Sequence, residues 1–158
     1  MVRLPFWVAP ASRLIIGLQS LGIAFFSFHT LTIPGRRSGR PRTTVVSPFT
    51  VDGRRYVLSF GDLAWVRNAR AAGQGVLGRG RSRTKVAIVE ILPPEGASIA
   101  SEFPGQVPAG VRFFVQTGLV DSPGRPDQFA AAAANLALFR LDPVHAPKTE
   151  AAGPKAGR

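Results

Sequence analysis

The sequence contains no cysteine, only two histidines and a single tyrosine. Without cysteine the chain has no disulfide, no thiolate zinc site and no cysteine nucleophile. His29 and His145 lie far apart along the chain, which disfavours a histidine-based metal centre or a Ser-His-Asp triad. Acidic residues are also scarce: the chain has nine of them and twenty lysines and arginines, which gives a net charge of +11. This excess of positive charge favours an anionic partner.

Long hydrophobic runs are missing as well. The longest apolar stretch lies within residues 14–26, which is shorter than the ~20 residues that a membrane-spanning helix needs. It predicts a helix over residues 11–25 that either packs on the domain or lies on a membrane surface. Pro5 and Pro10 interrupt the sequence before it, which disfavours a secretory signal peptide. We expect a cytoplasmic protein, with peripheral contact to the inner face of the cell membrane as the second interpretation of residues 1–27.

A chain of 158 residues, 45% of them hydrophobic, is long enough to bury the core of one globular domain. We expect this domain to span residues 28–145, between the N-terminal segment and a disordered tail over residues 146–158. Short Val- and Thr-rich runs bounded by glycine and proline predict strands joined by tight turns. Asp52 and Gly53 predict a two-residue hairpin turn among them.

Turn residues and hydrophobic spacing together predict the order of the elements. We expect strands over residues 28–33, 42–50, 56–60, 74–79, 84–92 and 138–141, and helices over residues 63–72, 95–103 and 126–136. Asp62 is the expected N-cap of the first of these helices, and Gly73 is expected to end it. Residues 110–120 are compatible with either type of element. This content indicates an α+β, mostly β fold, namely a small β-barrel with an N-terminal helix and short flanking helices.

The positive charge is concentrated in one part of the chain. Residues 36–85 contain twelve lysines and arginines and two acids, so ten of the eleven net charges fall there. Within this region, Gly35 and Gly39 flank an Arg-Arg-Ser segment at residues 36–38. Guanidinium forks, a hydroxyl and backbone N–H groups that converge in such a turn form an anion cradle. A solvated basic hairpin is the plain alternative, and nucleic acid is disfavoured because aromatic residues do not interleave with the arginines.

Two stretches of the sequence resemble the deazaflavin-dependent nitroreductase family. The first is TIPGRRSGRPR at residues 32–42, and the second is WVRNARAAG at residues 65–73. The similarity extends over residues 31–92 and more loosely to residue 144. It implies a split β-barrel of the kind that binds flavins, and it implies the reduced deazaflavin coenzyme F420 as cofactor.

The resemblance also implies roles for individual residues. The matches to the family's phosphate-binding positions are Arg36, Arg37 and Ser38, with Gly39 in the same turn and Arg42 as an additional contact. Trp65 matches a tryptophan that packs near the deazaflavin ring, and Asn68 matches an asparagine of the cofactor pocket. Ser59 is similar in position to a serine that faces cofactor and substrate. Ser59 or Tyr56 is then expected to donate a hydrogen bond to the oxyanion that develops on the substrate.

The implied activity is that of an F420-dependent oxidoreductase. It transfers a hydride from the reduced deazaflavin to a small, electron-poor apolar substrate such as a quinone, an enone or a nitro compound. Flavin mononucleotide (FMN) is the alternative cofactor, and the alternative function is a non-catalytic split barrel that binds a flavin, a deazaflavin or a lipid. We expect no metal and no nucleic-acid partner. A homodimer is also expected, because split barrels often pair.

Overall fold

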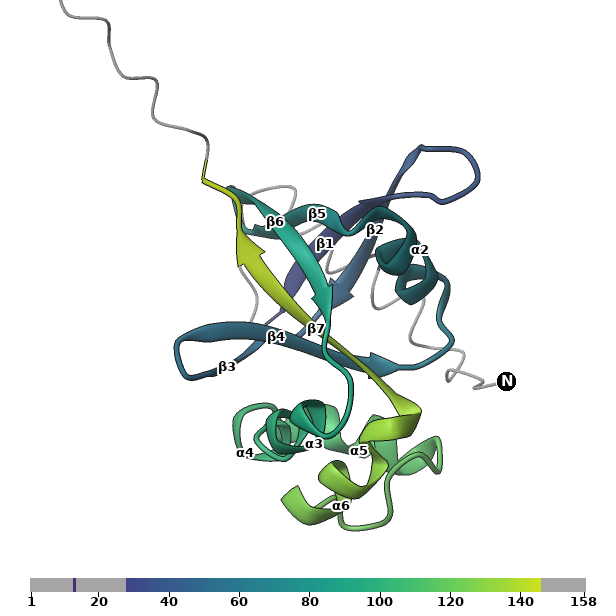
Figure 1. The fold of residues 1–158 in the computed structure, drawn as a ribbon, viewed down its shortest axis with the longest axis vertical. Coiled ribbons are helices and arrows are strands. Elements are labelled where there is room, and N and C mark those ends of the chain that lie inside the picture. Colours follow the sequence, from purple (N-terminus) through teal and green to yellow (C-terminus); the bar gives the residue numbers. More distant parts are fainter. Residues whose placement is uncertain (1–12, 14–27, 146–158) are drawn as a thin grey trace, which may run out of the picture.

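The computed structural model describes residue 13 and residues 28–145 (Figure 1). The predicted N-terminal helix, apart from residue 13, and the predicted tail lie outside the described residues. Within the described part of the chain, no helix combines the length and the apolar character needed to cross a membrane.

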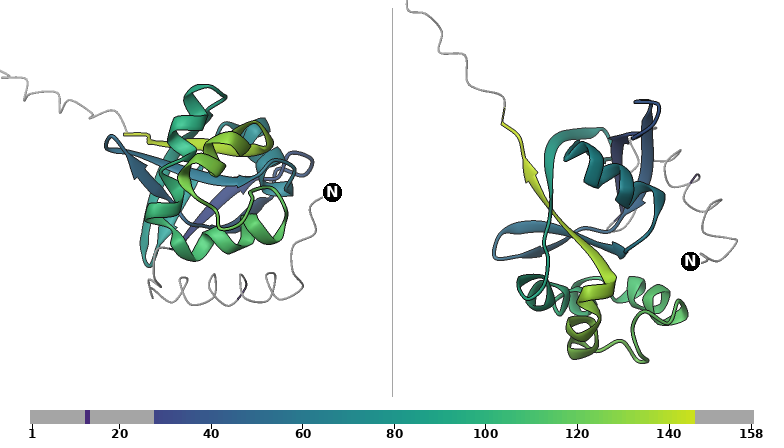
Figure 2. Two further views of the ribbon diagram at one scale, coloured as in Figure 1. Left: turned by 90° about the horizontal axis from the view of Figure 1, so that it is seen from below. Right: turned by 45° about the vertical axis from the view of Figure 1, so that its right-hand side comes forward.

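One antiparallel sheet of seven strands organises the domain. Its strands are β1 (His29–Pro34), β2 (Pro41–Val46), β3 (Phe49–Val51), β4 (Arg54–Phe60), β5 (Gln74–Arg79), β6 (Ser82–Glu90) and β7 (Leu136–Pro143). Their order in the sheet is β2-β1-β5-β6-β7-β4-β3, and every neighbouring pair is antiparallel. The sheet curls so that β1 and β4, which are not neighbours, both face the barrel interior (Figure 2).

Helices occupy two places around the sheet. The helix α2 (Ala64–Ala72) joins β4 to β5 and packs against β1, β5 and β6. The others are α3 (Glu95–Ala100), α4 (Phe103–Gln106), α5 (Pro108–Gln116) and α6 (Pro126–Ala132), followed by the short 3-10 turn η1 (Ala133–Asn135). They form a layer below β4 and β7, as Figure 1 shows. The sheet is therefore covered on one face at α3 to α6 and curls around α2 on the other.

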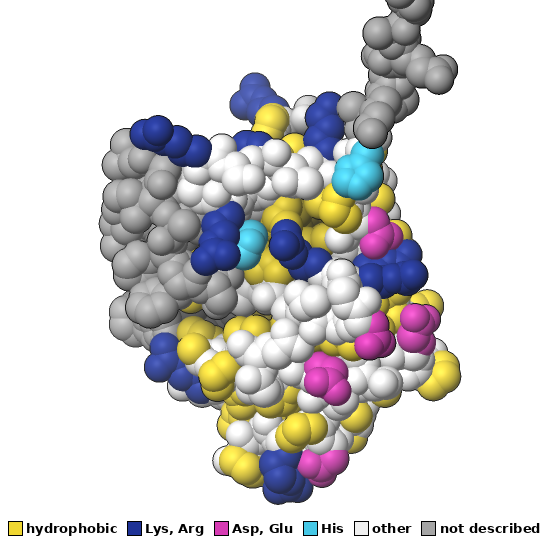
Figure 3. Space-filling view, turned by 90° about the vertical axis from the view of Figure 1, so that its left-hand side faces the viewer, with side chains coloured by type: hydrophobic (Ala, Val, Ile, Leu, Met, Phe, Trp, Pro, Cys, Tyr) yellow, Lys and Arg dark blue, Asp and Glu magenta, His cyan; other side chains and the backbone are white. Residues whose placement is uncertain are grey.

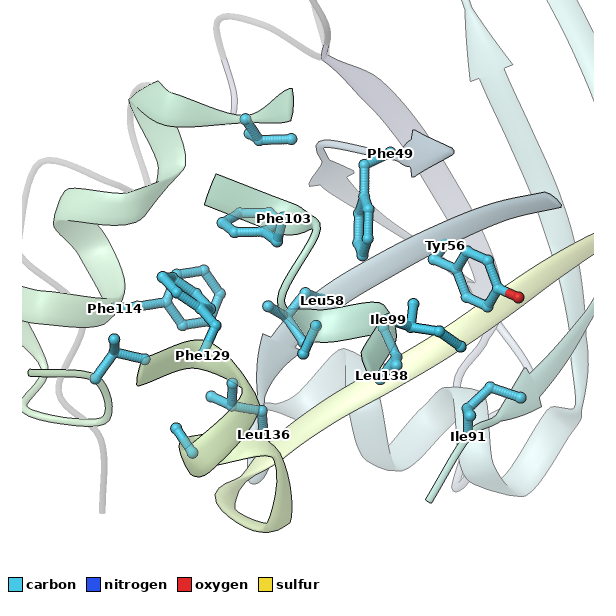
Figure 4. Packing of buried hydrophobic residues seen from close by; sticks show 14 of the residues in the cluster. Phe49, Tyr56, Leu58, Ile91, Ile99, Phe103, Phe114, Phe129, Leu136 and Leu138 are labelled. Atoms are coloured by element: carbon cyan, nitrogen blue, oxygen red, sulfur yellow. The ribbon is translucent and has the colours of Figure 1, made fainter. Parts of the chain in front are cut away.

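Side-chain alternation along β4 divides the core into two clusters. Tyr56, Leu58 and Phe60 point toward the helical layer, where they meet the phenylalanines of α4, α5 and α6 (Figure 4). Phe103, for example, packs against Phe114 with ring centroids 5.3 Å apart. Side chains of the opposite face fill the barrel interior, namely Leu31, Ile33, Val46, Val57, Val66, Ala69, Leu77, Val86, Ile88, Ala137, Phe139 and Leu141.

Local turn chemistry predicted two features of this fold correctly. Asp52 and Gly53 have φ angles of 50° and 73° and form the hairpin turn between β3 and β4. Gly73 has φ 64°, and its N–H donates to the carbonyl of Ala69 at 2.8 Å to end α2. The left-handed conformation at both places explains why glycine, or the tolerant Asp52, stands there.

The prediction of one continuous strand over residues 42–50 is wrong. This stretch divides into β2 and β3 at Ser47 and Pro48, because proline has no N–H to donate to a strand ladder. The predicted N-cap is also wrong: Leu63, and not Asp62, is the N-cap of α2, and no side chain caps the helix. The Asp62 carboxylate instead lies 3.6 Å from the Arg67 guanidinium.

The C-terminal half differs more from its prediction. The single helix expected over residues 95–103 ends at Ala100, and α4 begins as a separate helix at Phe103. Pro104 explains the break, since it cannot donate the backbone hydrogen bond that would continue α3. The ambiguous residues 110–120 are mostly helical, in α5. The last strand is longer than the predicted 138–141 and lies between β6 and β4.

Candidate functional site

The arginine turn, residues 35–40, joins β1 to β2. Its two glycines close it: the Gly35 N–H donates to the carbonyl of Arg40 at 2.9 Å, and the Gly39 N–H donates to the carbonyl of Gly35 at 2.8 Å. Gly39 has φ 69°, which favours glycine at this position. The Ser38 hydroxyl accepts from the Arg40 N–H at 3.3 Å. The closed turn leaves the side chains at residues 36–38 on the surface.

Donors in this turn are available to a ligand. The N–H groups of Arg37 and Ser38 make no hydrogen bond with any described residue. Arg42 is also exposed and lies close by, since a Cβ on Gly35 would stand 3.6 Å from its Cγ. Free backbone donors beside several guanidinium groups form a site suited to a phosphate or carboxylate.

Asn68 connects this turn to α2. Its side-chain oxygen Oδ1 accepts from the backbone N–H of Arg36 at 3.3 Å and from Arg36 Nη1 at 3.3 Å. Asn68 is only 7% exposed, so this oxygen has little access to water as an alternative partner. The structure thus brings the two family-like stretches together at the end of the barrel where β1 finishes.

The remaining part of α2 seals this end of the barrel. Val66 and Ala69 are fully buried in the interior cluster. Trp65 is only partly buried, and its ring lies against Phe139 of β7, with centroids 5.7 Å apart and planes inclined by 53°. The partly exposed indole therefore offers an aromatic surface on the same helix that contacts the arginine turn.

Ser59 is a buried polar residue on the interior face of β4. It is 6% exposed and pairs with Ala137 of β7. Its hydroxyl makes no hydrogen bond with any other described residue. Phe139, which supports Trp65, is a diagonal neighbour across the same strand pair, a relation that places Cα atoms about 7–8 Å apart. An unsatisfied hydroxyl in such a position calls for an explanation, and a bound ligand is one.

Tyr56 does not join this group. It stands three residues before Ser59 on the same strand and so points to the opposite face. There it packs in the helix-side cluster, with its ring 6.0 Å from that of Phe49 (Figure 4). The structure therefore brings together the arginine turn, Asn68, Trp65 and the neighbourhood of Ser59, and it leaves Tyr56 apart.

Sequence reasoning did not single out Arg70, which holds the site's helix in place. Arg70 binds the Glu90 carboxylate of β6 through Nε and Nη2, at 3.0 Å and 2.7 Å, and its Nη1 donates to the carbonyl of Gly61 at 3.2 Å. The hydrogen bonds to Glu90 raise the pKa of Arg70 above its ordinary value. A basic residue in the last turn of a helix was a visible signal, but its partners are distant in sequence.

Comparison with known proteins identifies the architecture. No protein-family model matches the chain, and no curated protein matches it. Among solved structures, one described as a domain-swapped dimer is 14% identical, with a TM-score of 0.55 over 86% of this chain and 97% of that chain. An F420-H2 dependent reductase is 15% identical, with a TM-score of 0.52 over 74% and 95%. A NimC/NimA family protein from Clostridium acetobutylicum is 9% identical, with a TM-score of 0.52 over 83% and 81%.

The chain has the split β-barrel fold. The predicted fold class is therefore confirmed for the described residues. At these identities the likeness concerns the fold alone.

Proposed function

We propose that this split barrel is an F420-dependent oxidoreductase whose cofactor lies at the α2 end of the barrel. The observation that carries the proposal is the contact of Arg36 with Asn68, because it joins an anion cradle to the helix that bears Trp65. An F420-H2 dependent reductase is among the proteins with a similar fold, so the fold is compatible with this chemistry.

The residues present fit a deazaflavin cofactor. Its phosphodiester and carboxylates suit the exposed guanidinium groups and the free N–H groups of Arg37 and Ser38. Its planar ring suits the partly exposed face of Trp65. The unpartnered Ser59 hydroxyl provides a buried donor on the interior side of the barrel. When bound, the reduced cofactor supplies the hydride.

The protein's own residues bind and orient in this proposal. The residues that hold the phosphate are Arg36, Arg37, Ser38, Gly39 and Arg42. Asn68 positions Arg36 through its amide oxygen. Trp65 excludes water from one side of the ring, and the Ser59 hydroxyl donates to an oxygen of the ring or of the substrate. We assign this donor role to Ser59 and not to Tyr56, because Tyr56 faces the helical layer.

The substrate class follows from the apolar surroundings of the donor. Trp65 packs against the apolar interior cluster, and Ser59 pairs with Ala137, a member of that cluster. A small, uncharged, electron-poor acceptor such as a quinone, an enone or a nitro compound fits such surroundings. We also propose a homodimer, which light scattering on the purified full chain would measure.

The proposal is tested by equilibrium dialysis of the full chain against oxidised F420, with FMN in a parallel cell. We expect saturable F420 binding, weakened at least about tenfold when Arg36 and Arg37 are both replaced by alanine, because each charged hydrogen bond contributes about 1.5–3 kcal/mol. The matched control is Arg81→Ala with Arg83→Ala, which removes the same charge from the β5–β6 hairpin. No binding of F420 at ~1 mM, a limit of ~4 kcal/mol of affinity, would overturn the proposal. If FMN binds more tightly than F420, the cofactor of this site is FMN.

Turnover is a separate measurement. The reduced cofactor is mixed with the full chain and a quinone, and loss of reduced deazaflavin is followed by absorbance. We expect protein-dependent oxidation that disappears in the Arg36→Ala, Arg37→Ala variant. Tight binding without oxidation by a quinone, an enone or a nitro compound would instead make the protein a carrier.

A further inference from the structure

The other end of the barrel contains a second basic site, remote from the arginine turn. β1 runs from His29 to the arginine turn, so its first residue lies at the opposite end of the barrel. A hollow of about 290 Å³ opens there, and four strands line it. Its lining residues are His29, Arg55, Leu77, Arg79, Ser82 and Thr84. We call it the distal hollow.

Strand alternation explains why these side chains converge. Arg55 stands two residues before Val57, and Val57 faces the barrel interior. The same relation links His29 to the interior Leu31, and it links Arg79 to the interior Leu77. Pairing of β5 with β6 then places a hydroxyl residue opposite each of these two β5 residues. Ser82 pairs with Arg79, and Thr84 pairs with Leu77. The hollow is the continuation of the barrel interior, with cationic and hydroxyl side chains where the apolar residues end.

The described residues that line the hollow carry charge of one sign only. No Asp or Glu is among them. Arg55 makes no hydrogen bond and no ion pair with any described residue. Figure 3 shows this face of the molecule, where Lys and Arg side chains lie on both sides of a histidine and the acidic side chains lie elsewhere. A guanidinium group such as that of Arg55, with no acidic partner among the described residues, favours an anion at a concave surface.

We propose that the distal hollow binds the phosphate group of a small molecule, at a site separate from the proposed cofactor site. A carboxylate is planar and is satisfied by one guanidinium fork, whereas the tetrahedral oxygens of a phosphate accept from donors on several sides. The donors here come from several strands around the hollow: guanidinium groups from β4 and β5, and hydroxyls from β6. The volume is at the lower limit of ligand pockets, about 300–1,000 Å³, so it fits a phosphate or a small phosphorylated molecule better than a dinucleotide.

The test is a titration of the nitrogen-15-labelled full chain with inorganic phosphate, followed by amide NMR signals. We expect saturable shifts at Ser82 and Thr84, and a weaker response to acetate at the same ionic strength. Arg55→Gln should weaken phosphate binding at these signals about tenfold, the effect of one charged hydrogen bond. Arg54→Gln is the matched control: it removes the same charge from the adjacent residue, which faces the other side of β4, and should leave binding unchanged.

The amide signals of Ser82 and Thr84 report on the distal hollow alone. The test of this proposal is therefore independent of the test of the proposed function. The Arg36→Ala, Arg37→Ala variant should retain phosphate binding at Ser82 and Thr84. Equal weakening by Arg54→Gln and Arg55→Gln would show a general charge effect and overturn the proposal, as would non-saturable shifts or equal binding of acetate. If Arg55→Gln does not fold, Thr84→Val tests phosphate binding in its place, because it removes one donor hydroxyl and keeps the β-branched shape. Unchanged phosphate affinity in Thr84→Val would then contradict the site.

Discussion

The amide oxygen of Asn68 lies 3.3 Å from both the backbone nitrogen and the Nη1 atom of Arg36. The two residues are 32 positions apart in the sequence, one in the arginine turn and one on α2. One buried oxygen therefore accepts from both the backbone and the side chain of Arg36, which is exposed. These two hydrogen bonds join the turn to α2.

Asn68→Ala should weaken binding of F420 about five- to tenfold and lower the free energy of unfolding by about 1 kcal/mol. The reason is that the Arg36 N–H loses its acceptor in a partly buried position. Equilibrium dialysis and urea denaturation measure the two effects. Arg67→Ala, on the exposed face of the same helix, is the control and should change neither quantity appreciably, since its ion pair with Asp62 is exposed. A loss of stability without any loss of affinity would separate Asn68 from the site.

Ser59→Ala should leave the free energy of unfolding unchanged or raise it by up to about 1 kcal/mol, because the variant removes a buried hydroxyl that has no partner among the described residues. The same variant should reduce cofactor affinity or turnover about tenfold. Thr30→Val is the comparison, since the Thr30 hydroxyl is equally buried but donates to the carbonyl of Gly78. Marked destabilisation of Ser59→Ala with unchanged turnover would show a purely structural hydroxyl.

Arg70→Met should lower the free energy of unfolding by about 1 kcal/mol, as it removes the hydrogen bonds to Glu90 and to the carbonyl of Gly61. Arg70→Lys should recover only part of the loss, because an ammonium group cannot reproduce the planar fork. The raised pKa of Arg70 implies stabilisation that is complete below the ordinary pKa of an arginine and is lost only as pH rises beyond it. Unfolding measured between about pH 6 and pH 9 should therefore show the same Arg70→Met penalty throughout.

Gly73→Ala should destabilise the protein by about 1–2 kcal/mol, the cost of a left-handed conformation for a residue with a Cβ. A Cβ at Gly73 would meet no atom within 4 Å, so the backbone φ of 64° is the only source of strain. Gly105→Ala is the matched control, because that glycine also has open space but no positive φ. Thermal unfolding of the two variants measures the difference, and equal midpoints would contradict the explanation.

Local chemistry explains which parts of the fold were predictable. The hairpin at Asp52 and Gly53, the end of α2 at Gly73 and the strand β5 depend on residues adjacent in sequence, and these predictions agree with the structure. The break at Pro48 was missed because the surrounding Val- and Thr-rich run resembles one strand. The place of β7 between β6 and β4 depends on non-local pairing that no short stretch reveals.

The site was predictable in its parts and not in its assembly. The arginine turn and the helix with Trp65 and Asn68 were visible as motifs, but the hydrogen bonds that join them come from tertiary structure. The prediction that either Ser59 or Tyr56 donates to the substrate did not take the strand period into account. Residues separated by an odd number of positions on one strand point to opposite faces. The functional roles of all these residues stay predictions.

Alternation along β4 also makes this strand sensitive to a change of register. Its even-numbered aromatic and aliphatic residues belong to the helical layer, and its odd-numbered residues include Arg55 at one end of the barrel and Ser59 at the other. A slip of β4 by one residue against β7 would exchange the two sets, since the side-chain period is two. The slip would direct Phe60 into the interior and Ser59 into a layer of phenylalanine rings. Both ends of the barrel would lose their polar groups through a single change of register.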